Sequence, residues 1–246
     1  MGKNKVFYFF YGMVLTAFLV SSVVLAIRLK QQRQGKEFYE QMGGAEIIAP
    51  FYVSDTVLPV APAISEDADH IISPDEYPDI AAWLQIPGTP VDYPVMFGAD
   101  NEFYLDHLPD GRKNVLGSLF FDCRLDKDSQ HLIIYGHNGS GGKMFGSLKQ
   151  YESQDYFAEH PTLKLITSDT MYVCPIFSVR RVDADSDAYE LDFGSNGDFL
   201  HYVEQAADES LYPVDMDFGN IKKVLTLSTC TGMPGQRLVI QAALIL

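Results

Sequence analysis

A predominantly apolar run lies at the start of the chain, over residues 6–27, and this run contains no charged residue. A helix rises about 1.5 Å per residue, so the 22 residues of the run are long enough to cross a bilayer. A cleavable signal has a shorter apolar core and small residues before a cut site, whereas this run leads into Arg28 and Lys30. The pattern therefore predicts an uncleaved transmembrane anchor within residues 1–30.

Residues 31–74 show no sustained periodicity and contain prolines, which break regular structure, at Pro50, Pro59, Pro62 and Pro74. The polar residues 28–41 can prolong the anchor helix, and the remainder of the segment predicts a stem or linker. A globular domain is then expected over residues 75–246. Its first residues, 75–84, read as a short helix that brings Trp83 onto the domain.

Beyond residue 90 the apolar positions occur in short extended segments bounded by turn formers. These segments lie near 91–96, 115–121, 131–135, 163–167, 170–181, 223–230 and 237–245. Many short strands of this kind favour a mainly β sandwich or barrel over a parallel α/β fold. Helical spacing predicts two interruptions, at 144–151 and 197–207.

The last two extended segments bring a cysteine and an arginine together. Side chains alternate along 223–230, so Thr226, Ser228 and Cys230 share one face. Turn formers occupy 231–236 before Arg237 resumes an extended pattern, which predicts antiparallel neighbours with both residues at one end. A thiolate beside a guanidinium suits acyl transfer, although a lone cysteine at the end of a strand often serves only packing.

A candidate base lies at another junction between a strand and a loop. Gly136 stops the strand at 131–135, and His137 then opens a loop whose glycine-rich part is 139–142. Catalytic groups are often presented at such junctions, and histidine titrates near neutral pH. The glycine-rich part lacks the Lys-Ser/Thr of a phosphate-binding loop.

Composition limits the partners of this chain. It has 246 residues with 18 Lys and Arg against 33 Asp and Glu, and the net charge of −15 disfavours nucleic-acid binding. The remaining histidines show no metal-ligand spacing with the cysteines, so no metal and no cofactor are expected. Cys174 reads as a buried filler, a disulfide between Cys123 and Cys174 is left open, and Cys230 is expected to be the unpaired, reactive thiol.

Together these motifs resemble those of the sortases, in the order that this family uses. The segments Tyr135-Gly136-His137-Asn138, Thr226-Leu227-Ser228-Thr229-Cys230 and Arg237-Leu238-Val239 match its His, Cys and Arg motifs. Further segments are similar to class B, from about residue 80 to 246: Trp83-Leu84-Gln85-Ile86-Pro87-Gly88-Thr89, Val91-Asp92-Tyr93-Pro94-Val95, Asp100-Asn101-Glu102-Phe103-Tyr104-Leu105, Gly117-Ser118-Leu119-Phe120 and Met144-Phe145.

The resemblance implies a mainly β fold with a closed eight-stranded β-barrel, N-terminal helices and a helix in the loop before the strand that bears the cysteine. It implies a membrane-anchored cysteine transpeptidase of a Gram-positive bacterium, which cleaves the C-terminal sorting signal of exported proteins after Thr. The cleaved protein is held as a thioester and passed to an amine of a peptidoglycan precursor or a pilin.

The resemblance also implies roles for individual residues. Cys230 is the expected nucleophile, His137 the proton donor and acceptor, and Arg237 the group that stabilises the tetrahedral oxygen. Expected substrate-binding residues are Ser228, Thr229, Asn101 and Leu105.

Two alternatives remain open at this point. An L,D-transpeptidase or other cell-wall cysteine peptidase would share the thiol, but the former has Ser-x-Gly-Cys-x-Arg, whereas here Thr229 precedes Cys230 and Arg237 follows seven residues later. A non-catalytic surface adhesin would bring Cys230, His137 and Arg237 together only by accident.

The basic residues that flank the apolar run do not by themselves give the orientation expected for the anchor. Two basic residues, Lys3 and Lys5, precede the apolar run, whereas Arg28, Lys30, Arg33 and Lys36 follow it, and this bias alone would put the domain in the cytoplasm. Long domains translocate largely regardless of flanking charge, and the resemblance implies work on the outer face. The expected protein therefore crosses the cell membrane once, with its domain outside the cell.

Overall fold

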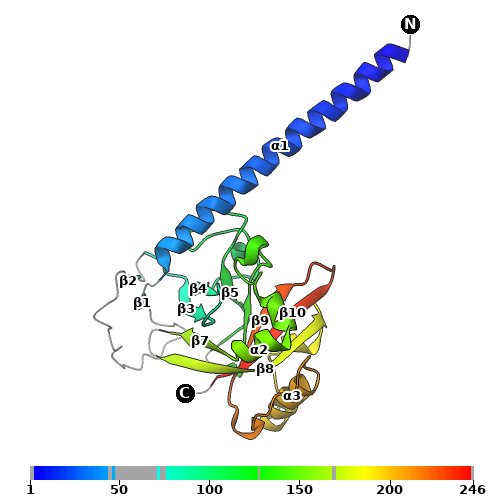
Figure 1. Cartoon of the computed structure of the whole chain (residues 1–246). Helices are drawn as coiled ribbons and strands as arrows, with labels where there is room; N and C mark the ends of the chain where they lie inside the picture. Colours follow the sequence, from blue (N-terminus) through cyan, green and yellow to red (C-terminus); the bar gives the residue numbers. More distant parts are fainter. Residues whose placement is uncertain are drawn as a thin grey trace.

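A computed structural model describes residues 3–43, 46–47, 71–72, 76–126, 128–167 and 170–244. One long helix, α1 (Lys3–Met42), runs away from a β-barrel that forms the rest of the molecule (Figure 1). Two short strands, β1 (Glu46–Ile47) and β2 (Ile71–Ile72), pair in parallel. Most of the expected stem, residues 48–70, lies outside the described residues.

The barrel is closed and contains eight strands in the order β10-β8-β7-β3-β4-β5-β6-β9. Two neighbouring pairs, β4 with β5 and β6 with β9, are parallel, and the other pairs are antiparallel. The strands are β3 (Ile80–Gln85), β4 (Asp92–Met96), β5 (Leu119–Phe121), β6 (His131–Tyr135), β7 (Thr162–Ile166), β8 (Met171–Asp183), β9 (Val224–Cys230) and β10 (Gln236–Ala243). The expected mainly β, eight-stranded barrel is confirmed, and each extended segment expected beyond residue 90 overlaps one of its strands.

The first barrel strand is where the sequence prediction was wrong. Residues 75–84 were expected to be a helix, but Ile80–Gln85 is strand β3, paired with β4 on one side and β7 on the other. Five of its six residues are buried, so the segment lacks the polar and apolar alternation that marks a half-exposed strand. Trp83 does pack into the core, as expected.

Short helices lie between the strands: η1 (Phe103–Leu105), η2 (Ser140–Gly142), η3 (Leu148–Glu152), α2 (Gln154–Glu159), η4 (Asp187–Tyr189), α3 (Asn196–Asp208) and η5 (Phe218–Asn220). Helix α3 lies in the connection before β9, which confirms the helix expected there. It buries Phe199 and Val203 in a cluster with Phe177 and Val224 of the barrel.

The helix expected at 144–151 was partly wrong. A 3-10 turn begins only at Leu148, and α2 follows it. Met144 has a φ of +50°, in the left-handed region that a right-handed helix cannot contain. The local backbone therefore prevents a helix from starting at 144.

The last turns of α1 belong to the packed structure. Gly35, Phe38, Tyr39 and Met42 are buried and fall on one face of the helix. The Tyr39 hydroxyl donates a 2.6 Å hydrogen bond to the Gly117 carbonyl. Residues expected to form part of a stem thus rest directly on the barrel, which gives a rigid connection between the apolar part of α1 and the domain.

The N-terminal part of α1 has the opposite character. Within the described residues, α1 is the single helix long and apolar enough to cross a membrane, and 0% of its apolar window is buried. The described residues bury none of this apolar surface, which is compatible with a bilayer-spanning segment.

Candidate active site

The end of strand β9 presents Cys230 to solvent. Its register partner across the antiparallel pair of β9 and β10 is Arg237, as the sequence predicts. The turn between the strands contains Gly232 and Gly235 at φ values of +94° and +76°, which glycine adopts without the steric cost of a side chain. The tight reversal holds the thiol and the guanidinium at one end of the barrel.

Arg237 is half-buried, and its guanidinium has no carboxylate partner among the described residues. Its guanidinium donates to the neighbouring Gln236 carbonyl at 3.2 Å, and no ion pair joins it to a carboxylate within the described part of the chain. A planar fork without a carboxylate partner is available to a negatively charged oxygen of a ligand.

His137 is brought to the thiol by the parallel pairing of β6 with β9. Tyr135 is the register partner of Ser228, so continuing both strands by two residues puts His137 beside Cys230. The Gly136 N–H donates to the Ser228 carbonyl at 3.2 Å, and the Asn138 side-chain amide donates to the Cys230 carbonyl at 2.8 Å. These two hydrogen bonds hold the end of β6 against the end of β9.

Glycine is required immediately before His137. A Cβ atom on Gly136 would lie 2.4 Å from Leu119 Cδ2 and 2.6 Å from Phe145 Cδ2, which is closer than packed atoms can approach. The sequence motif Gly136-His137 therefore has a steric reason.

The imidazole of His137 is oriented by Leu105, the last residue of η1. Its Nε2 lies 2.6 Å from the Leu105 carbonyl oxygen, and since a carbonyl only accepts, Nε2 carries the proton of this bond. In the neutral ring Nδ1 is then the nitrogen free to accept a proton. Gly117, at a φ of +59°, is required here because a Cβ would come within 2.5 Å of the same carbonyl.

The four residues expected to bind substrate have different surroundings. Ser228 is buried and its hydroxyl lies 2.8 Å from the Tyr189 hydroxyl, while Thr229 donates to the Gly136 carbonyl at 2.8 Å. Asn101 accepts from the Cys123 N–H at 2.8 Å, which ties its loop to the turn after β5. Leu105 remains 40% exposed, so it is the one of the four with a large free apolar surface.

Tyr189, from η4, is a site residue that the sequence did not reveal. Burial raises its pKa, the Ser228 hydroxyl and the charge of Arg237 oppose that rise, and Cys230 adds to it. The Tyr189 hydroxyl lies 2.8 Å from the hydroxyl of Ser228, which is two residues before Cys230 on β9. Tyr189 comes from a loop of 12 residues between β8 and α3, which has no periodic pattern that could have identified it.

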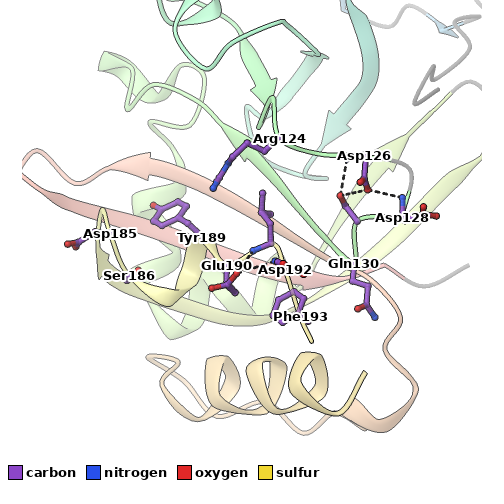
Figure 2. A pocket seen from close by; sticks show the side chains of 12 residues that line it. Arg124, Asp126, Asp128, Gln130, Asp185, Ser186, Tyr189, Glu190, Asp192 and Phe193 are labelled. Carbon is purple, nitrogen blue, oxygen red and sulfur yellow. Dashed lines mark hydrogen bonds between the residues drawn. The ribbon is translucent and has the colours of Figure 1, made fainter. Parts of the chain in front are cut away.

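A hollow of about 650 Å³ opens beside Tyr189, between residues 124–130 and 185–193. Figure 2 shows Tyr189 and Asp185 at one end of it and Asp126 and Asp128 at the other. Five carboxylates line it, from Asp126, Asp128, Asp185, Glu190 and Asp192. A smaller cavity of about 130 Å³ lies at Cys230 itself, with Asn138, Phe145 and the ion-paired Glu152 and Arg181 in its wall.

The turn that carries Arg124 to the large hollow is held by a buried charge. Burial alone would raise the pKa of Asp122, but hydrogen bonds from Arg124 and Tyr135 outweigh it and lower that pKa to about 2. The Arg124 guanidinium donates to both carboxylate oxygens, at 2.9 and 2.7 Å. Asp122 thus remains ionised and fixes the direction of Arg124.

The three cysteines are free thiols, so the disulfide left open between Cys123 and Cys174 is not formed. Cys174 is completely buried, and this burial raises its pKa to about 12, which makes it an unreactive filler as expected. Among the described residues, no group of three or more His, Cys, Asp or Glu side chains could hold a metal ion.

Comparison with known proteins finds the Sortase domain family over residues 84–245. The chain is 35% identical over 157 residues to Sortase B of Listeria monocytogenes, and 27% identical over 154 residues to Sortase B of Staphylococcus aureus. Each alignment covers 62% of this chain and 63% of the relative, so the chain spans somewhat less than two thirds of the length of these relatives.

Solved structures give the same picture. Sortase B from Bacillus anthracis, in complex with AAEK1, matches with a TM-score of 0.64 and 31% identity, over 70% of this chain and 81% of that one. A Staphylococcus aureus sortase B–substrate complex matches with a TM-score of 0.65 and 25% identity, over 70% of this chain and 82% of that one.

Proposed function

The chain belongs to the sortase family, in its class B, and we propose that it is a cysteine transpeptidase that acts on the sorting signals of exported proteins. The observation that carries the proposal is the meeting of an exposed thiol, an arginine without a carboxylate partner and an oriented histidine at one end of the barrel. Neither an L,D-transpeptidase nor an adhesin accounts for this arrangement on a sortase barrel.

In the first half of the proposed reaction, the Cys230 thiolate attacks the carbonyl carbon of the Thr residue in the sorting signal. Arg237 donates hydrogen bonds to the tetrahedral oxygen as its negative charge develops. The protonated His137 then gives its proton to the departing amine. The peptide bond breaks, and the exported protein is held as a thioester on Cys230.

In the second half, an amine of a peptidoglycan precursor or of a pilin replaces the sulfur. His137, now neutral, accepts the proton that this amine loses when it attacks the thioester. The thiolate leaves, and the new amide bond joins the exported protein to its acceptor. The Cys230 thiolate and the protonated His137 are thereby restored.

The supporting residues have distinct proposed roles. Leu105 and Asn101 form one wall of the sorting-signal groove, with Leu105 supplying the apolar contact. Ser228 acts on the substrate through Tyr189, because its hydroxyl is engaged by that side chain. Thr229 supports the wall indirectly by holding the Gly136 carbonyl, and through it the backbone before His137.

The acyl-enzyme provides a direct test of this proposal. We expect the full-length protein in detergent to cleave some members of a library of sorting-signal peptides, such as LPxTG-like and NPxTN-like sequences. A short amine such as triglycine should be joined to the cleaved fragment, and in its place hydroxylamine should displace the Cys230 thiolate and release the fragment as a hydroxamate. Mass spectrometry detects both products, and the absence of both across the library would overturn the transpeptidase proposal.

We propose that α1 crosses the cell membrane once and leaves the barrel outside the cell. The barrel rests on α1 from residue 35 onward, only about two turns beyond the apolar run, so the active site is held close to the bilayer surface. Acceptor amines on membrane-bound precursors would then be within reach.

Protease digestion of intact protoplasts tests this orientation. Fragments that contain Cys230 should disappear from intact protoplasts, and the full-length protein should fractionate with membranes and retain its first residues. A cytoplasmic reporter protein should survive in the same sample as a control for intact membranes. If the domain is degraded only after lysis, the basic residues after the apolar run set a cytoplasmic orientation, and the proposed substrates become inaccessible.

A further inference from the structure

A chain of polar side chains lies buried between the outer surface of the barrel and helix α3. His131 of β6, Thr226 of β9 and Gln241 of β10 are 0% exposed, and Arg180 of β8 is 2% exposed. Burying such groups is costly unless each is hydrogen-bonded, so a cluster of this kind calls for a specific reason. None of these residues belongs to the proposed catalytic set.

Hydrogen bonds connect these side chains in series, from Arg180 through Gln241 and Thr226 to His131. The Arg180 guanidinium donates to the Gln241 side-chain oxygen at 3.1 Å, and the Gln241 amide donates to Thr226 Oγ1 at 3.1 Å and to the Tyr202 hydroxyl at 2.7 Å. Thr226 Oγ1 lies 2.6 Å from His131 Nε2. At the far end, His131 Nδ1 lies 2.6 Å from the Glu190 carbonyl oxygen.

These partners determine the tautomer of His131. A carbonyl oxygen only accepts, so Nδ1 carries the proton and donates it to Glu190. Burial lowers the pKa of His131 to about 4, so the ring is neutral at physiological pH and Nε2 accepts from the Thr226 hydroxyl. Each of these hydrogen bonds then has one donor and one acceptor, whereas the buried Nε of Arg180 finds no acceptor among the described residues.

The network ends on both sides of η4, the short turn that carries Tyr189. Asp187, its first residue, lies 3.7 Å from the Arg180 guanidinium, and Arg180 also pairs with Glu209 at the end of α3. Glu190 follows directly after η4 and gives its carbonyl to His131. Between these two anchors, Tyr189 reaches Ser228 and forms one wall of the large hollow (Figure 2).

We propose that His131 is a positioning residue, which fixes η4 through its Nδ1–H bond to the Glu190 carbonyl and so holds Tyr189 in the groove where the sorting signal binds. The proposal rests on the proposed function, because it assigns the groove to that substrate. His131 does not touch the reacting atoms, so its effect should fall on substrate binding rather than on the reactivity of the thiol.

Two substitutions in the full-length protein separate the ends of the imidazole. The amide nitrogen of Asn takes the place of Nδ1, whereas that of Gln takes the place of Nε2. We expect His131→Gln to raise KM for the cleaved peptide about 10-fold, the size of effect expected from one lost buried hydrogen bond, and to leave kcat within about 2-fold. His131→Asn should keep KM within about 2-fold of the wild-type value.

A double-mutant cycle with Tyr189→Phe shows whether His131 acts through Tyr189. If it does, the effects of His131→Gln and Tyr189→Phe on KM are not additive. Alkylation of Cys230 by iodoacetamide should proceed at the wild-type rate in both His131 variants, which controls for an intact catalytic end. Full additivity, or an Asn variant as impaired as the Gln variant, would overturn the proposal.

Nitrogen NMR of the wild-type protein with labelled histidine tests the same bond without a substitution. At pH 7 His131 should be the neutral Nδ1–H tautomer, and it should remain neutral until the pH approaches 4. The charged and titratable groups that face it are Asp122 from the end of β5, Arg180 from β8, Glu190 after η4 and Tyr202 from α3. The Nε2–H tautomer at pH 7 would refute the assigned bond. This measurement decides the inference even if no peptide is cleaved, an outcome that would count against the proposed function alone.

Discussion

Replacement of Cys230 by Ala is expected to abolish peptide cleavage and amine transfer while leaving the fold unchanged. In the proposed mechanism the Cys230 thiolate forms the acyl intermediate, so no other side chain of the site can substitute for it. Cys230 is exposed at the end of β9, and surface substitutions of this kind change the free energy of unfolding by no more than about 0.5 kcal/mol. Activity on a quenched peptide and the thermal unfolding midpoint measure the two effects.

The other cysteines supply matched controls for this experiment. Cys174→Ala removes a buried thiol whose pKa is raised by burial to about 12, so it should cost stability but keep activity. Cys123→Ala should keep both. Turnover that persists in a folded Cys230→Ala protein would refute the thioester mechanism.

Replacement of Arg237 by Ala is expected to lower kcat/KM by at least about 10²-fold, because the proposed role of the guanidinium is to stabilise charge that develops only in the transition state. Arg237 has no carboxylate partner among the described residues, so its loss leaves no buried charge unpaired and should change stability little. Steady-state kinetics on the cleaved peptide, with a thermal melt as the fold control, measure this outcome.

Lys at position 237 distinguishes a shaped donor from a simple positive charge. Lysine keeps the charge but offers a point source in place of a planar fork, so Arg237→Lys should recover only a small part of the lost activity. Near wild-type kcat/KM in that variant would reduce Arg237 to a general electrostatic role. A control is Arg33→Lys, in an exposed ion pair with Glu37 on α1, which should be far less sensitive.

The barrel could be predicted from the sequence wherever one side of a strand differs from the other. Alternation along residues 224–230 and the turn formers after Cys230 were sufficient to pair that strand with Arg237, because a short loop leaves antiparallel pairing as the simplest outcome. Strand β3 was missed for the opposite reason. Its residues are buried on both faces, and a short apolar run of this kind reads equally well as helix or strand until its neighbours are known.

The candidate site also has a part that local sequence motifs predict and a part that depends on long-range pairing. Local motifs identified Cys230, His137 and Arg237, because glycine and turn residues mark where each strand ends. The parallel pairing of β6 with β9 joins segments about 90 residues apart, and no local pattern contains that register. It is this register that brings His137 to the thiol.

By itself, then, the sequence determined the apolar run, the alternation of the strands and the candidates for the reactive groups, since each depends on residues close together in the chain. The tertiary structure alone decided the docking of α1 through Tyr39, the place of Tyr189 beside Ser228 and the bond from His131 to Glu190. Those contacts join residues between 39 and 78 positions apart. They form only when the closed barrel has fixed the positions of its loops, because long-range contacts depend on chain closure and not on local preference.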